Sequence, residues 1–219
     1  TYYLFVPPDY VPDKSWPIIF LIGERGEDPK TIIGPWVKWA EKNQFFLIAI
    51  PNLTPEKDVP YKVDEWLLEI KKEIDERFRI DRNQILLMGY ESGAHYAAYL
   101  GVKYPEEFSA AALFRSAWAG PFEKLIKLDK DAKRKIAFFV AIEPDDAIYQ
   151  ATEAKALEFE KKGYAVKMEA IRPQEEAALM ERMIQWFLND VESRTILKEK
   201  PKVTFKEKLN EAVHNFFET

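Results

Sequence analysis

Short apolar runs alternate along the chain with longer segments whose apolar residues recur every three or four positions. The short runs are typical of buried strands, and the longer segments are typical of amphipathic helices that cover a sheet. Strands are predicted over residues 2–6, 17–22, 45–50, 85–89, 110–115, 136–142 and 165–171. Helices are predicted over residues 33–42, 63–78, 92–104, 150–162 and 175–190. This order predicts an α/β fold with a mainly parallel sheet and helices on both faces.

The pattern changes after residue 190, where a polar connection containing Pro201 leads to a last helical segment. Four apolar residues share one face of that segment: Phe205, Leu209, Val213 and Phe216. We therefore predict one domain over residues 1–190 and a C-terminal extension over residues 191–219 with an amphipathic helix. The apolar face needs a cover, and three alternatives stay open: its own domain, a second copy of the chain in a homo-oligomer, or a neighbouring domain.

Composition narrows the class of protein. The 219 residues suit one domain, and the net charge of −5 is spread along the chain, which argues against nucleic acid or an anionic membrane as partner. No cysteine is present, so disulfides and thiolate chemistry are excluded. No apolar run has the roughly 20 residues of a membrane span, so we expect a soluble chain. Because the chain starts at Thr1 and runs at once into a strand, we expect an excised or processed piece, and its compartment stays unknown.

One short motif indicates a possible catalytic site. Gly89-Tyr90-Glu91-Ser92-Gly93 follows an apolar strand and precedes a helix rich in small residues. The pattern is that of a G-x-S-x-G nucleophile elbow, with glutamate in place of the serine. The flanking glycines are expected because the central residue of an elbow is held in strained backbone geometry.

Around this motif the chain resembles the esterase branch of the α/β-hydrolase superfamily, in particular the polyhydroxybutyrate-depolymerase and feruloyl-esterase-like proteins. The resemblance extends over residues 2–187. It rests on four segments besides the elbow: residues 3–7 (YLFVP), 16–20 (WPIIF), 78–85 (FRIDRNQI) and 104–110 (YPEEFSA). It implies a three-layer α/β-hydrolase fold.

The same resemblance implies a catalytic serine, an aspartate and a histidine, which this chain matches only in part. Glu91 stands at the nucleophile position. Asp146 lies close to the expected position of the aspartate, beyond the strand that ends at Ile142. The loop after residue 171, where the histidine is expected, reads Arg172-Pro173-Gln174-Glu175-Glu176 and contains no histidine. The triad is therefore degenerate.

The oxyanion site of the family is expected after Ile22, at Gly23-Glu24-Arg25-Gly26. Backbone N–H groups of Glu24 or Arg25, together with that of Ser92, are the expected donors. Glu24, Arg25, Glu91 and Ser92 are expected to line any pocket, together with two further residues at a neighbouring strand end, Arg115 and Trp118.

Glu91 has two interpretations. A carboxylate nucleophile would define a third class of hydrolase, but that chemistry needs a histidine-activated water. We favour a structural carboxylate bound by the N–H groups of the helix start, with Arg25 or Arg115 as its ion-pair partner.

Three further interpretations concern the residues around the elbow. Ser92, with His95 as its base, is an alternative catalytic pair. His95 is, however, expected on the surface or the packing face of its helix. His214, on the terminal helix, is expected on the surface. The acidic residues Glu143, Asp145 and Asp146 lack a metal-binding pattern, so no metal and no cofactor are predicted.

Taken together, these residues predict an esterase-like protein that is catalytically inactive and acts as a binding or structural module for an unknown protein or small-molecule ligand. The alternative is an active carboxylesterase or serine hydrolase that uses Ser92 or an unrecognised group.

Overall fold

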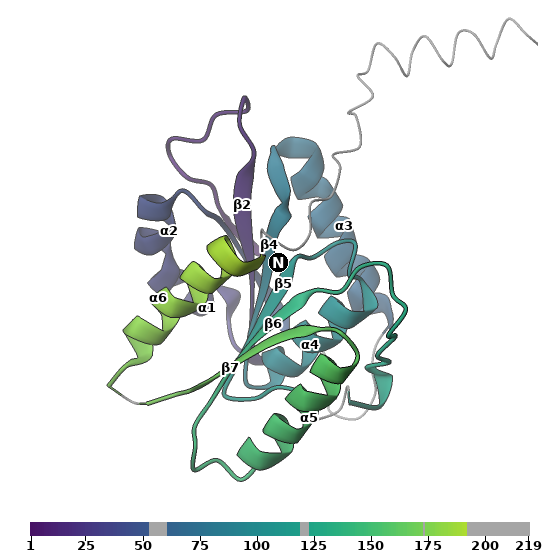
Figure 1. Cartoon of the computed structure of the whole chain (residues 1–219). Coiled ribbons are helices and arrows are strands. Elements are labelled where there is room, and N and C mark those ends of the chain that lie inside the picture. The colour runs from purple at the N-terminus through teal and green to yellow at the C-terminus, as the bar shows by residue number, and fades with distance from the viewer. Residues whose placement is uncertain (53–60, 119–122, 173, 192–219) are drawn as a thin grey trace, which may run out of the picture.

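A seven-stranded sheet forms the centre of the computed structural model, which describes residues 1–52, 61–118, 123–172 and 174–191 (Figure 1). The strands lie in the order β1-β3-β2-β4-β5-β6-β7. Only β1 runs antiparallel to its neighbour β3, and the other five pairings are parallel. The strands are β1 (Tyr3–Phe5), β2 (Trp16–Arg25), β3 (Phe46–Asn52), β4 (Ile80–Tyr90), β5 (Ala110–Phe114), β6 (Ala137–Ile142) and β7 (Ala165–Ala170).

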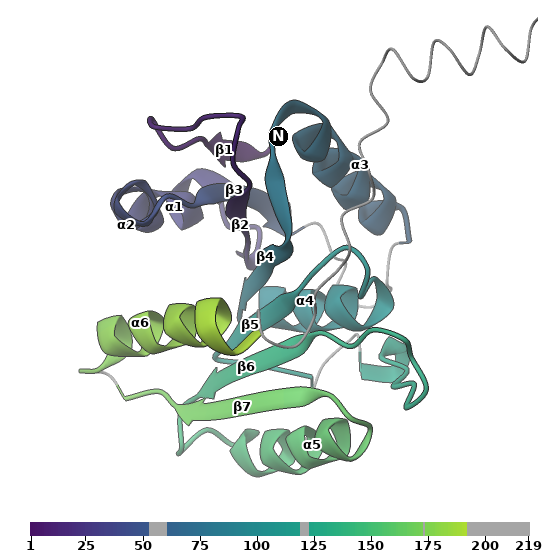
Figure 2. The same ribbon diagram turned by 45° about the horizontal axis from the view of Figure 1, so that its top comes forward.

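Helices cover both faces of the sheet. They are α1 (Pro29–Ile33), α2 (Val37–Asn43), α3 (Tyr61–Arg77), α4 (Ser92–Lys103), α5 (Tyr149–Lys161) and α6 (Glu176–Trp186), with short helical turns η1 (Gly34–Trp36), η2 (Glu123–Leu125) and η3 (Phe187–Val191). Figure 2 shows α3, α4 and α5 on one side of the sheet and α1, α2 and α6 on the other. Two apolar cores fill the two interfaces, so the molecule has three layers.

The alternation of side chains along β2 explains why both cores exist. Ile18 and Phe20 enter the core under α3 and α4, whereas Ile19 and Leu21 enter the core under α1 and α6. All four side chains are buried, as expected for a central parallel strand that is covered on both faces. This is the physical origin of the continuous apolar run in the sequence.

Each predicted strand corresponds to an observed strand, within a few residues at the ends. The largest difference is at β4, which begins at Ile80 because Trp16 of β2 pairs with Ile80 ahead of a register shift. The predicted helix over residues 33–42 is divided into α1, η1 and α2 around Gly34 and Pro35. The predicted terminal helix lies outside the described residues.

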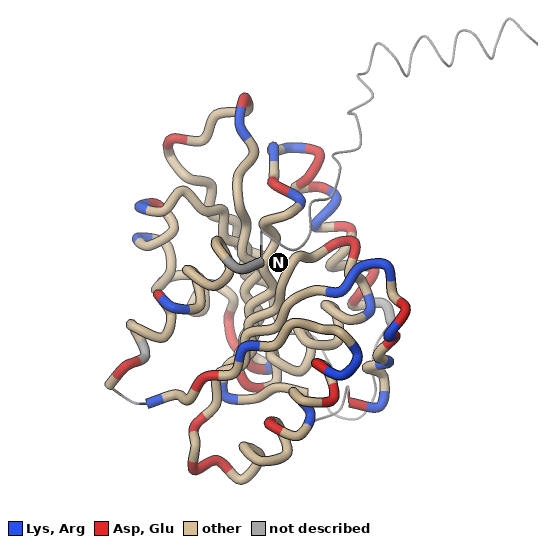
Figure 3. Tube along the Cα trace, viewed as in Figure 1, with Lys and Arg blue, Asp and Glu red and all other residues tan. Residues whose placement is uncertain are grey.

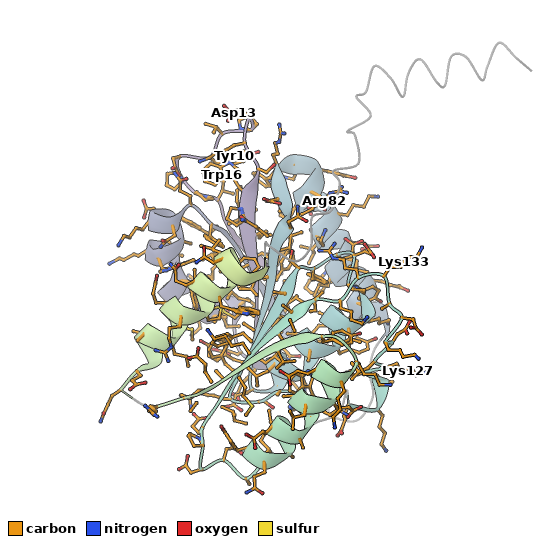
Figure 4. The ribbon with its side chains drawn as sticks, viewed as in Figure 1. Tyr10, Asp13, Trp16, Arg82, Lys127 and Lys133 are labelled. Carbon is orange, nitrogen blue, oxygen red and sulfur yellow. The ribbon has the colours of Figure 1, made fainter. Side chains whose placement is uncertain are left out.

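Most charged residues lie on the helices and loops around the sheet, and both signs are interspersed (Figure 3). Among the described residues, no helix is long and apolar enough to cross a membrane. In Figure 4, Tyr10, Asp13 and Trp16 mark the segment that leads into β2, and the ring centroids of Tyr10 and Trp16 lie 5.6 Å apart. The carboxyl ends of the parallel strands lie at the opposite edge of the sheet.

Candidate functional site

The carboxyl ends of four neighbouring strands bring the candidate residues together. Strand register aligns Ile22 with Gly89, Tyr90 with Phe114, and Phe114 with Ala141. Because aligned parallel strands end side by side, the segments that follow β2, β4, β5 and β6 meet at one edge of the sheet. Open α/β sheets bind ligands at this edge.

The turn between β4 and α4 has the geometry of a nucleophile elbow. Glu91 has φ 49° and ψ −119°, a backbone conformation that residues other than glycine rarely adopt. Its N–H donates to the Phe114 carbonyl at 3.0 Å, and its carbonyl accepts from the Ala94 N–H at 3.0 Å. A side chain at Gly93 would collide with the carbonyl oxygens of Ile22 and Gly23. The elbow glycine is therefore required by close packing, as the sequence indicated.

The Glu91 carboxylate is left without a partner inside this turn. It does not cap α4, and it forms no hydrogen bond or ion pair with any described residue. Burial raises its pKa, and the negative charges of Glu24, Glu143 and Asp146 raise it further, whereas Arg115 lowers it. The predicted structural carboxylate, held by the helix N–H groups, is therefore wrong.

The predicted ion pair of Glu91 with Arg25 or Arg115 is also absent from the described residues. Arg115, which has φ 58°, directs its guanidinium to Glu143 beyond β6, and the two form an ion pair. The physical reason lies in the sheet, since Arg115 donates its N–H to Ala141 on the neighbouring strand at 2.9 Å. This strand pairing brings Arg115 next to Glu143, which follows β6.

In the oxyanion segment after β2, the backbone N–H groups are already hydrogen-bonded within the protein. The N–H of Glu24 donates to the carboxylate of Glu27 at 3.1 Å, and the N–H of Arg25 donates to Ser92 Oγ at 3.0 Å. Asn52 Nδ2 donates to the same Ser92 oxygen at 3.1 Å and to the Gly23 carbonyl at 3.1 Å. Both predicted backbone donors of this segment are thus bound to side chains of the protein itself.

His95 lies one turn after Glu91 on α4, and its ring contacts a different hydroxyl from the one considered in the sequence. Its Nε2 is hydrogen-bonded to Ser116 Oγ, two residues beyond β5. Burial lowers the pKa of His95, and the positive charge of Arg25 lowers it further. Sequence reasoning missed Ser116, and no local signal marks it, because the pair is formed by a helix and a strand end that are 21 residues apart.

Two of the remaining predicted site residues contribute to the structure of the protein: Asp146 to a turn and Trp118 to the core. Asp146 Oδ1 accepts from the Ile148 N–H at 2.9 Å and so orders the turn before α5. Trp118 lies in the core with 1% of its surface exposed, and its ring centroid is 4.4 Å from that of Phe159. His214 lies outside the described residues. Among the described residues, no group of three or more histidine and acidic side chains is placed to hold a metal ion.

No protein-family model matches the chain, and no curated protein matches it in sequence. Among solved structures it is similar to a thermostable esterase, with 19% identity and a TM-score of 0.63 over 85% of this chain. It spans 58% of the length of that esterase.

Two further structures have comparable size. The S-formylglutathione hydrolase FrmB of Staphylococcus aureus matches with 13% identity and a TM-score of 0.64, over 86% of this chain and 92% of the hydrolase. A ferulic acid esterase matches with 13% identity and a TM-score of 0.63, over 85% of this chain and 90% of the esterase. The chain therefore has the α/β-hydrolase fold of esterases and serine hydrolases, as its motifs implied.

Proposed function

We propose that this protein is an esterase-fold module without hydrolase turnover that acts by binding a ligand or partner at the edge containing Glu91. The observation that carries the proposal is that the elbow is kept while the oxyanion segment in front of it is closed. Ser92 Oγ and the Glu27 carboxylate occupy the N–H groups of Arg25 and Glu24. A tetrahedral oxyanion needs such donors to be free and directed at it.

The missing chemistry supports the same proposal. A carboxylate at the elbow has no hydroxyl proton to give up and does not act as a serine does. The loop after β7 contains no imidazole. His95 contacts Ser116, whereas Ser92 accepts hydrogen bonds from amide donors. This arrangement argues against the alternative in which Ser92 and His95 form a catalytic pair.

The state of Glu91 supports a binding role. Its carboxylate has no described partner, and its burial, together with three acidic neighbours, raises its pKa. A partly buried carboxylate without a hydrogen bond costs free energy, and an approaching donor group recovers it. A ligand that presents ammonium, guanidinium or amide N–H groups therefore suits this position.

The proposal is tested by steady-state hydrolysis of p-nitrophenyl acetate and p-nitrophenyl butyrate. We expect the wild-type protein and Glu91→Ser to show no turnover above the rate in buffer, because restoring a hydroxyl supplies no base and does not free the Glu24 and Arg25 N–H groups. Ser92→Ala is the matched control. Multiple turnovers that disappear in Ser92→Ala would refute the proposal and establish an active serine hydrolase.

A binding role is tested separately with a small cationic probe. We expect benzamidinium to bind the wild-type protein weakly by titration calorimetry and to lose that binding in Glu91→Gln, which keeps the shape of the side chain and removes its charge. Equal affinity in the two proteins would exclude Glu91 as the recognition group.

A further inference from the structure

A hydroxyl and an imidazole that play no part in the proposed function form a second chemical group beside the elbow. Ser116 Oγ and His95 Nε2 are hydrogen-bonded, and the two residues are supplied by the segment just after β5 and the first turn of α4. A nucleophile in hydrogen-bond contact with a base is the arrangement used for covalent catalysis on many folds.

The contact distinguishes Ser116 from Ser92 and Ser109, two other serines beside β4 and β5. Ser92 Oγ accepts from two amide donors, at Arg25 and Asn52. Ser109 Oγ lies between the Ile85 N–H and the Arg82 carbonyl, at 3.1 and 3.3 Å. These hydroxyls are held by backbone or amide groups that do not remove a proton, whereas Ser116 contacts an imidazole.

The surroundings of His95 favour the form of the ring that accepts a proton. Burial and the charge of Arg25 both disfavour imidazolium and lower the pKa of His95. In the neutral ring with its hydrogen on Nδ1, Nε2 accepts the Ser116 hydroxyl proton. No acidic residue of the described chain bonds to His95. Within the described part of the chain, the pair therefore has no orienting third group of a triad.

We propose that Ser116 is a covalent acylation site for small activated esters, with His95 as its proton acceptor. Ser116 Oγ attacks the ester carbonyl and forms an Oγ–C bond, while the bond from carbon to the leaving oxygen breaks and the group leaves with that electron pair as an alkoxide or phenoxide. The hydroxyl proton moves to His95 Nε2. The acyl group stays on Ser116.

Burial sets the limits of this reaction. Ser116 is 5% exposed, so we expect it to react with short acyl groups in preference to long ones. The same burial hinders the water that would release the acyl group, and no carboxylate among residues 1–52, 61–118, 123–172 and 174–191 bonds to His95 to help it activate that water. The expected product is one acyl group per chain without turnover, which is compatible with an esterase fold that hydrolyses nothing at its elbow.

The test is peptide mapping by mass spectrometry after the full chain reacts with p-nitrophenyl acetate. We expect one acetyl group on Ser116, formed faster than the background acetylation of lysines, and little reaction there with p-nitrophenyl octanoate. We expect His95→Gln to slow acetylation of Ser116 about 100-fold, the usual contribution of a positioned general base. Ser116→Ala should abolish the adduct.

The matched control is Ser109→Ala, which removes a buried serine that has no imidazole contact and should leave the Ser116 adduct unchanged. Thermal unfolding of each variant shows whether it is folded, and the map of the wild-type protein tests the site without any substitution. Absence of acetyl on Ser116, or an equal rate in folded His95→Gln, would overturn the proposal. Neither result bears on turnover at the elbow, so the two proposals fail separately.

Discussion

At the scale of single residues, Glu91 is held in a conformation and an environment that both cost stability. A non-glycine residue at φ 49° and ψ −119° is strained, and the strain costs on the order of 1–3 kcal/mol. The carboxylate adds a second cost, because burial and acidic neighbours disfavour its charged form. Residues that are held at such a cost occur at functional sites.

We expect Glu91→Gly to stabilise the protein by about 1 kcal/mol, because glycine adopts this backbone conformation without strain. The corresponding rise in Tm is about 2–4 °C for a domain of this size. Thermal unfolding measured by circular dichroism at neutral pH checks the change.

Glu91→Gln separates charge from strain. The folded-state pKa of Glu91 is raised above its ordinary value of 4.5, so the folded state holds the proton more tightly than the unfolded state does. Its contribution to stability is therefore present at acidic pH and is lost as pH rises through the folded pKa. We expect Glu91→Gln to be more stable than the wild type at pH 7, with a difference that disappears below about pH 4. A difference that is equal at both pH values would contradict this account.

At the scale of elements, helices α3 and α4 are joined by a buried aspartate. Asp64 on α3 is fully buried and accepts from Tyr96, Tyr99 and Lys103 of α4 at 3.0, 2.8 and 2.7 Å. Tyr104 donates to it at 3.1 Å. Burial raises the pKa of Tyr99 to about 12, so its hydroxyl remains a donor at neutral pH.

We expect Asp64→Ala to destabilise the protein by about 3–5 kcal/mol, because the change leaves a lysine and three hydroxyls without their shared acceptor. A fall in Tm on the order of 10 °C follows for a domain of this size. Urea unfolding monitored by tryptophan fluorescence measures the free energy of unfolding.

The matched control on the same helix is Glu76→Ala. Glu76 pairs with Lys72 at 3.9 Å, and the side chains are 67% and 78% exposed. Such exposed pairs contribute less than about 1 kcal/mol. If the two substitutions cost the same, the buried network has no special role in joining the helices.

At the scale of the whole molecule, helix α4 carries the elbow and lies against the centre of the sheet. Gly89 and Gly93 bring its first turn close to the backbone of β2 and β4, since a side chain at either glycine would meet backbone atoms. The same approach places the N–H of Arg25 within reach of Ser92. The closed oxyanion segment is therefore a consequence of how helix and sheet pack.

We expect Gly93→Ala to destabilise the protein by about 1–3 kcal/mol, the usual cost of overpacking, because its methyl group meets the carbonyls of Ile22 and Gly23. Gly34→Ala is the control, since a side chain there meets no atom within 4 Å and its φ of −51° suits alanine. That change should be neutral or stabilising by up to about 1 kcal/mol. Thermal unfolding of the pair distinguishes crowding from the general effect of removing a glycine.

The sequence by itself determined the strands and the elbow. A central strand such as β2 must be apolar on both faces because helices cover both sides of the sheet, and that requirement is visible in residues 17–22. The elbow is visible because only glycine fits at residues 89 and 93. The absence of an imidazole from the loop after β7 is equally a property of the sequence.

Only the tertiary structure decided which polar groups are partners. Ser92 accepts from Arg25, 67 residues away, and His95 contacts Ser116 rather than Ser92. The predicted pairing of Glu91 with an arginine failed because the sheet register brings Arg115 to Glu143. Hydrophobic patterns record which face of a segment is buried, whereas a hydrogen bond depends on positions within a few tenths of an ångström, which strand register and helix packing set together.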